Sequence, residues 1–267
     1  MPASLFERID VTRFQPTEHS RGPWSPDLLH GGPVAALLAH QLYAASPEGQ
    51  WFPARLTVDL MRPVTLAPLD VSTSVLRTGR KAALLSADCH SDGVLVARAT
   101  QQLIASRDVS IPRGSPARQW VDVGNDTSPE TTLRTSPPAR SSGDVAFHSH
   151  SVEHRSPDNA LSGGGPATDW IRVDANLLSE VPLSPFERVV CAADFTNGIS
   201  SSLPFEDYTF VNADLTVQTF RLPVDDWVQL DAVTNVGDLG VGMADSKLLD
   251  RSGLLGHACQ SLVVARR

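Results

Sequence analysis

The sequence predicts an α+β protein with two tandem halves, each a long buried helix wrapped by an antiparallel sheet. Two apolar helical segments, 31–45 and 184–203, are each followed by a series of strand-like segments with turn residues between them. The two series also share their spacing. The interval from Thr57 to Gln101 has the same length as the interval from Thr216 to Gln260. Equal spacing of similar segments indicates an internal repeat, whose halves can pair their edges into one continuous sheet.

The first half covers residues 1–110. Residues 4–16 alternate apolar and polar side chains, as a half-buried strand does. Gly31 and Gly32 precede Pro33, which fits the start of the first helix, and an almost uniformly apolar Ala/Leu run follows. The four strands expected after this helix are 54–63, 69–78, 82–90 and 93–106.

Residues 111–144 are rich in Pro, Ser, Thr and Arg and show no periodicity, so they are interpreted as a linker. The second half, residues 145–267, begins with strands at 145–154 and 170–173 and continues into the second helix. The strands expected after that helix are 209–223, 227–236, 241–249 and 254–265.

Composition excludes several classes of function. The chain of 267 residues has a formal net charge of −8 and no basic stripe, so a nucleic-acid partner is not expected. Apolar runs are too short for membrane insertion, and the N-terminus lacks a signal-peptide pattern, which favours a cytoplasmic protein. The three widely spaced cysteines fit reduced core thiols better than disulfides or a nucleophile.

Asp194 is the residue around which the functional hypothesis is built. Ser184 can cap the second helix, with Pro185 in its first turn and Glu187 completing a capping box, and Gly198 is a plausible stop. Asp194 then falls in the last turn of an apolar helix, where a desolvated carboxylate suits a general base. The helix alone equally fits a structural Asp bonded to a neighbouring loop.

Other polar groups allow simpler interpretations. The Gly31-Gly32 pair could present backbone N–H groups to a phosphate or a developing oxyanion, or serve only close packing. His148, His150 and His154 are expected on a solvated strand face, and no metal site is expected because no matching carboxylate or cysteine accompanies them. Arg80 and Lys81 could bind the phosphates of a nucleotide-bearing ligand, although scattered surface charge explains them as well.

Several stretches resemble the double-hotdog acyl-CoA thioesterases typified by bacterial thioesterase II, over nearly the whole chain. The stretches are HGGPVAALLA, RLTVDLMRP, LVARATQQL, AADF, FVNADLTVQTFRLP and ACQSLVV. The resemblance implies a double-hotdog fold, hydrolysis of fatty acyl-CoA to acid and CoA without a cofactor, and a trio of Asp, Thr and Gln that activates water. By position the trio corresponds to Asp194, Asn212 and Gln260, so Asn stands where the family has Thr.

In this hypothesis Asp194 activates water, Asn212 and Gln260 position it, and His30, Gly31 and Gly32 form the oxyanion and substrate-binding site. Two alternatives stay open. A hotdog-fold enoyl-CoA hydratase or dehydratase could use His30 and Asp194, although no His follows Asp194 at the spacing such enzymes often show. A non-catalytic acyl-CoA binding protein would explain Asn212. A homo-oligomer is compatible with each reading.

Overall fold

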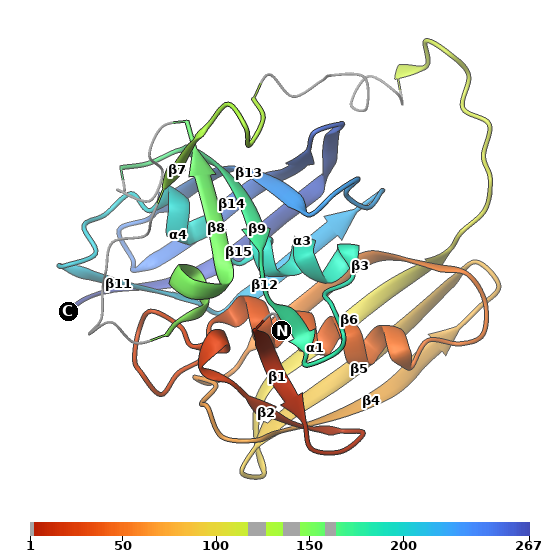
Figure 1. Cartoon of the computed structure of the whole chain (residues 1–267), viewed down its shortest axis with the longest axis horizontal. Coiled ribbons are helices and arrows are strands. Elements are labelled where there is room, and N and C mark those ends of the chain that lie inside the picture. The colour runs from red at the N-terminus through yellow and green to blue at the C-terminus, as the bar shows by residue number, and fades with distance from the viewer. Residues whose placement is uncertain (1–2, 117–126, 136–144, 158–163) are drawn as a thin grey trace.

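A computed structural model describes residues 3–116, 127–135, 145–157 and 164–267 of the chain. Within these residues, fifteen strands form one extended, curved sheet, and the two principal helices lie together on one side of it (Figure 1). The strand order is β10-β1-β2-β4-β5-β6-β3-β12-β15-β14-β13-β9-β8-β7, and β11 also pairs with β15.

The first half of the sheet surrounds helix α1, Gly31–Ala44. Nine of the helix residues are buried, because Val, Ala and Leu occupy nearly every side of it. The strands of this half are β1 (Ser4–Arg8), β2 (Arg13–Pro16), β3 (Trp51–Leu60), β4 (Leu69–Thr78), β5 (Ala82–Ser91) and β6 (Val94–Ala105).

The second half surrounds helices α3, Pro185–Ala193, and α4, Thr196–Ser200. The expected capping box is present: the Glu187 backbone N–H donates to the Ser184 hydroxyl, and the Glu187 carboxylate accepts from the Ser184 backbone N–H. The strands are β7 (Leu133–Thr135), β8 (Val152–Ser156), β9 (Ala167–Val173), β10 (Asn176–Leu178), β11 (Tyr208–Asn212), β12 (Asp214–Thr219), β13 (Trp227–Val236), β14 (Val241–Asp250) and β15 (Gly253–Arg266).

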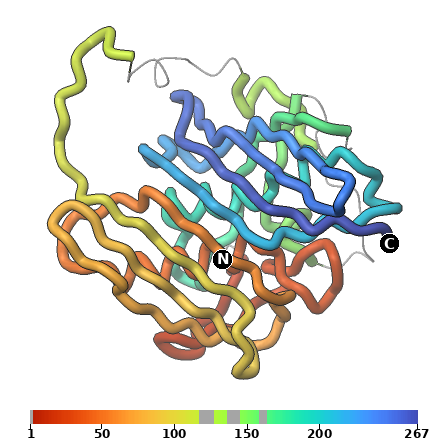
Figure 2. The backbone as a smooth tube through the Cα atoms, turned by 180° about the vertical axis from the view of Figure 1, so that it is seen from behind, coloured from red at the N-terminus to blue at the C-terminus, as the bar shows by residue number. Residues whose placement is uncertain are grey.

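Strands β3 and β12 join the two halves. They pair antiparallel with Thr57 opposite Thr216, and each is flanked on its other side by the strand that carries Gln101 or Gln260. Figure 2 shows the result from behind, with the orange and yellow strands of the first half continuing into the blue strands of the second. The matched spacing predicted from the sequence therefore corresponds to matched positions in one sheet.

Several expected elements differ from those observed; the strand expected at 209–223, for example, is two strands, β11 and β12, the second of which ends at Thr219. Residues 4–16 form two strands, since the Asp10 carboxylate accepts hydrogen bonds from the backbone N–H groups of Thr12 and Arg13 and closes a turn. The prediction of one continuous strand over residues 145–154 is wrong, because Phe147–Ser151 forms a π-helical turn, η3, before β8. The helix expected to end near Gly198 breaks earlier, at Asp194 and Phe195, and Gly198 lies inside α4 instead of ending the helix.

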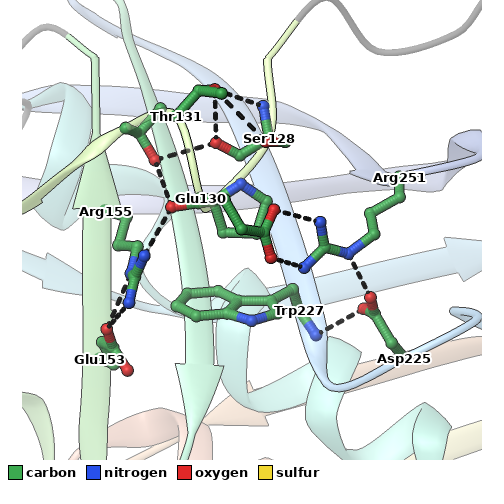
Figure 3. A network of polar contacts seen from close by, with 10 residues as sticks. Ser128, Glu130, Thr131, Glu153, Arg155, Asp225, Trp227 and Arg251 are labelled. Carbon is green, nitrogen blue, oxygen red and sulfur yellow. Dashed lines mark hydrogen bonds and ion pairs between the residues drawn. The ribbon is translucent and has the colours of Figure 1, made fainter.

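Residues 127–135 pack against the second half of the sheet. Figure 3 shows the polar contacts that hold them: the Arg251 guanidinium pairs with the Glu130 carboxylate, and Arg155 donates to the Pro129 carbonyl at 2.8 Å. Arg155 also stacks on the Trp227 ring, 5.3 Å from its centroid. Strand β7 then pairs with β8, so this part of the expected linker belongs to the sheet.

Candidate active site

Helices α1 and α3 approach most closely where α1 begins and α3 ends. A β-carbon on Gly31 would lie 2.9 Å from each carboxylate oxygen of Asp194, and one on Gly32 would lie 3.0 Å from the carbonyl oxygen of Cys191. A larger residue at either position would push the helices apart. Close packing therefore requires glycine at both positions, whether or not their backbone N–H groups also bind a ligand.

Asp194 is the C-cap residue of α3, and its side chain is only 3% exposed. The Asn212 amide donates to Oδ1 of Asp194 at 2.8 Å, and the Gln260 amide donates to the same oxygen at 3.2 Å. Both partners are side-chain amides that offer N–H groups, so the carboxylate acts as their acceptor. The carboxylate thus lies out of solvent, with its hydrogen-bond capacity partly satisfied.

The orientation of the Gln260 amide is fixed from both ends. Its oxygen accepts a hydrogen bond from the backbone N–H of Asn197 at 3.2 Å, and its nitrogen also donates to the backbone carbonyl of Asp194 at 3.2 Å. The second contact helps to explain why the helix breaks at Asp194, because this carbonyl bonds a side chain of the sheet instead of continuing the helix. Gln260 is buried and holds Asp194 in place.

His30 completes the set from the N-cap position of α1. Its Nδ1 lies 2.7 Å from Oδ2 of Asp194, and the imidazole is 10% exposed. A carboxylate that accepts from two amides is best matched by a third donor, so Nδ1 carries a hydrogen toward Asp194. The backbone N–H of Gly32 is directed at the same Nδ1, with 3.3 Å between the two nitrogens.

Two aromatic rings flank this polar centre. The His30 ring lies 4.7 Å from that of Phe195 and 5.1 Å from that of Phe147, measured between centroids. Both phenylalanines are buried. Hydrogen bonds beside such apolar walls are stronger than the same bonds in water.

Family models match both halves of the chain. The model of the acyl-CoA thioesterase N-terminal domain matches residues 20–103, and that of the acyl-CoA thioesterase C-terminal domain matches residues 126–264. The chain belongs to the acyl-CoA thioesterase family. It is accordingly a thioester hydrolase. No curated protein sequence matches it significantly.

Solved structures agree with the hotdog fold of this thioesterase family. A Thermobifida fusca protein provisionally assigned as a thioesterase II is 17% identical, with a TM-score of 0.76 and coverage of 99% of this chain and 96% of that one. A hot dog fold protein of unknown function from Alicyclobacillus acidocaldarius is 17% identical, with a TM-score of 0.70 and coverage of 97% and 95%. An acyl-CoA thioesterase II from Mycobacterium marinum is 13% identical, with a TM-score of 0.67 and coverage of 98% and 95%.

The thioesterase chain brings together six of the residues singled out from its sequence and leaves two apart. Those around the carboxylate are Asp194, Asn212, Gln260, His30, Gly31 and Gly32. Arg80 instead lines a surface pocket of about 500 Å³ near the segment that follows α1, together with Gly49 and Trp51. A helix of 14 residues is about 20 Å long, so this pocket and Asp194 lie toward opposite ends of α1. Lys81 follows Arg80 in the same hairpin.

The three histidines do not share a solvated strand face, although His150 is exposed. His148 and His150 belong to η3, and His154 lies in β8 with 1% of its surface exposed, paired to the buried Asp169. Sequence reasoning missed this pair. The alternation of Val152, His154 and Ser156 indicates one strand face, but nothing marks that face as the inner one, which is covered by the helices of the thioesterase half.

The remaining reactive groups near the site are structural. Cys191 is buried in α3, and burial raises the pKa of its thiol well above the ordinary value, which makes it a poor nucleophile. Among the described residues no group of three or more His, Cys, Asp or Glu side chains could hold a metal ion. In the same part of the chain, no helix combines the length and the apolar character needed to cross a membrane.

Proposed function

We propose that the protein hydrolyses fatty acyl-CoA thioesters to the free acid and CoA, with water activated by Asp194. The observation that carries this proposal is the buried Asp194 carboxylate, which receives Asn212 and Gln260 on one oxygen and His30 on the other. A carboxylate held in this way is a positioned proton acceptor. The thioester hydrolase class rests on the family, and the role of Asp194 is our assignment.

The start of α1 supplies the second requirement of the reaction. Attack of water on the thioester carbonyl places negative charge on its oxygen, and backbone N–H groups at a helix N-terminus stabilise such charge. The Gly32 N–H lies beside the Asp194 side chain and is directed at Nδ1 of His30 at 3.3 Å, so a substrate oxyanion would replace this long contact. We assign this N–H, with Gly31, to the oxyanion. The CoA thiolate then leaves with little acid assistance, because a thiol is a fairly strong acid.

Asn212 is compatible with this mechanism. It stands where the resemblance places a Thr, yet its amide reaches Oδ1 of Asp194 at 2.8 Å from β11. An amide N–H and a hydroxyl can both donate to a carboxylate. The substitution therefore keeps the hydrogen bond, and this supports activity over a purely binding role.

We also infer that the two halves form a double hotdog. The pairing of β3 with β12, the contact between α1 and α3, and the separate matches of an N-terminal and a C-terminal family domain support this arrangement. The site draws His30, Gly31 and Gly32 from the first half and Asp194, Asn212 and Gln260 from the second. Neither half contains the complete set.

The contact between His30 and Asp194 favours one second candidate, hydration of a 2-enoyl-CoA. An imidazole and a carboxylate held together are the acid and base that such a reaction needs, and here His30 is supplied from the other half of the chain. Purified protein offered saturated and 2-enoyl acyl-CoAs of equal length separates the two functions. Hydrolysis releases a free thiol from both substrates, whereas hydration removes the enoyl absorbance without releasing thiol.

A further inference from the structure

A second His–Asp pair lies on the inner face of the sheet, close to the site already described. Nδ1 of His154, in β8, is 2.6 Å from Oδ2 of Asp169, in β9, and the two side chains are 1% and 0% exposed. Burial raises the pKa of Asp169, although the hydrogen bond from His154 opposes this effect. The pair is therefore sealed within the second half of the protein.

Two polar atoms of the pair, Nε2 of His154 and Oδ1 of Asp169, have no hydrogen-bond partner among the described residues. Both atoms are buried. Removing a polar atom from water without a hydrogen bond is costly, and replacing a buried ionic pair by apolar residues often leaves stability unchanged or increased. A buried pair with two unbonded polar atoms, one on each side chain, provides a polar position for a ligand.

Phe195 connects this pair to the proposed catalytic centre. Its ring meets the His154 ring edge-on at 5.0 Å and the His30 ring at 4.7 Å, and Phe195 directly follows Asp194 in the chain. Phe147 stacks on the same ring at 5.7 Å. An acyl chain whose thioester lies at Asp194 would have to pass along these rings to reach His154.

The proton inventory of the pair selects the ligand group. In a neutral imidazole with its hydrogen on Nδ1, Nε2 of His154 is an acceptor. In the imidazolium, and in the tautomer whose Nδ1 accepts from a protonated Asp169, Nε2 carries a hydrogen and donates. A hydroxyl group can donate or accept, so it satisfies Nε2 in every state, whereas a carbonyl oxygen fits only the donating states and a methyl group fits none.

We propose that the His154–Asp169 pair forms the polar end of the acyl pocket and selects acyl thioesters that carry a hydroxyl group at the end remote from the thioester. This inference rests on the proposed function, because it places the thioester at Asp194. It makes His154 a specificity-determining residue, with Asp169 positioning the imidazole.

The test compares straight-chain acyl-CoAs from butanoyl to decanoyl, each with and without a terminal hydroxyl, by kcat/KM for thiol release. The wild-type protein should prefer the hydroxylated substrate about tenfold at the chain length that reaches His154, the effect of one ordinary hydrogen bond. In the double variant His154→Phe and Asp169→Leu, the preference should vanish or reverse. A thermal melt verifies that this variant folds, and Gln101→Leu, in the other half, should keep the wild-type preference.

Equal or slower turnover of the hydroxylated substrate at every length would overturn the inference, as would a preference that survives in the folded double variant. Binding to the Asp194→Asn protein, measured by calorimetry with the same pairs, separates this inference from the proposed function. Tighter binding of the hydroxylated acyl-CoA supports the inference even if no substrate is hydrolysed. Equal affinities for the two members of each pair contradict it even if the wild-type protein hydrolyses its substrates fast.

Discussion

Thr57 and Thr216 lie opposite each other where the two halves of the sheet join, with a hydrogen bond of 3.2 Å between their hydroxyl oxygens. About this pair the two glutamines occupy equivalent places, Gln101 on β6 and Gln260 on β15. Their surroundings differ. Gln260 binds Asp194, whereas neither amide atom of the fully buried Gln101 has a hydrogen-bond partner among the described residues. The repeat has kept the amide in both halves and the acid in one.

Replacing each glutamine by Leu should therefore change a different property: the stability of the protein at Gln101 and the rate of thiol release at Gln260. Gln101→Leu removes an unbonded buried amide and should raise the free energy of unfolding by about 1 kcal/mol, as measured in urea. Gln260→Leu should instead lower thiol release at least tenfold, because it frees the Asp194 carboxylate to move. A Gln101→Leu protein less stable than wild type would show that this amide has a partner in solution.

Gly31→Ala should impair catalysis more than folding. The new β-carbon would lie 2.9 Å from both Asp194 oxygens, so the carboxylate must shift. We expect kcat for thiol release to fall at least tenfold. Gly198→Ala, in α4, is the matched control, because its β-carbon would meet no atom within 4 Å, and its activity should match wild type. Full activity in Gly31→Ala would contradict the placement of the carboxylate.

The role of the hydrogen bond from Asn212 to Asp194 can be tested with one variant whose side chain is a shorter donor and another whose side chain has no donor. Asn212→Thr offers a hydroxyl, the donor that the resemblance implies at this position, and Asn212→Leu offers no donor to Oδ1 of Asp194. Steady-state kinetics should show kcat lowered at least tenfold in the Leu variant, with the Thr variant between it and wild type. Equal rates in all three proteins would mean that this hydrogen bond has no part in catalysis.

The Asp250 carboxylate is expected to stabilise the folded protein at neutral pH and to lose this effect in acid. Burial raises the pKa of this carboxyl, but hydrogen bonds from Arg221 and from the backbone N–H groups of Val224 and Ser252 outweigh it and hold the pKa below the ordinary value. A lowered folded-state pKa stabilises the protein above the ordinary aspartate pKa of about 4, and this contribution is lost as the pH falls below it.

Asp250→Asn should accordingly cost about 3 kcal/mol at neutral pH, because Arg221 loses its charged partner, and the cost should shrink on acidification. Chemical denaturation of both proteins from neutral pH down to about pH 3 measures this difference. A cost that is the same at every pH would show that another interaction of Asp250 dominates.

Much of the fold could be predicted from the sequence because its signals are local. Ser184, Pro185 and Glu187 form a capping box from neighbouring residues, and the equal intervals ending at Gln101 and Gln260 reveal the repeat without any long-range information. The break after Asp194 could not be predicted in this way. It depends partly on a hydrogen bond from Gln260, which lies on a distant strand.

The same distinction applies to the site. Asp194 is marked in the sequence as a carboxylate in a capped apolar helix, Asn212 and Gln260 follow from a resemblance in the order of short motifs, and His30 follows from its place before Gly31. Asp169 gave no signal because its partner, His154, lies on a neighbouring strand and the buried face of β8 was not evident from its alternation. The close approach of Gly31 to Asp194 likewise depends on how the two helices meet in space.

The central claim is that Asp194 activates the water that cleaves the thioester. Thiol release from an acyl-CoA by wild-type and Asp194→Asn proteins, with a thermal melt to verify that both fold, tests it most directly. We expect kcat of the Asn variant to fall at least about a hundredfold, since Asn keeps the shape of the side chain but cannot accept the proton. Comparable kcat in the two folded proteins would contradict the claim and leave the carboxylate with a structural role.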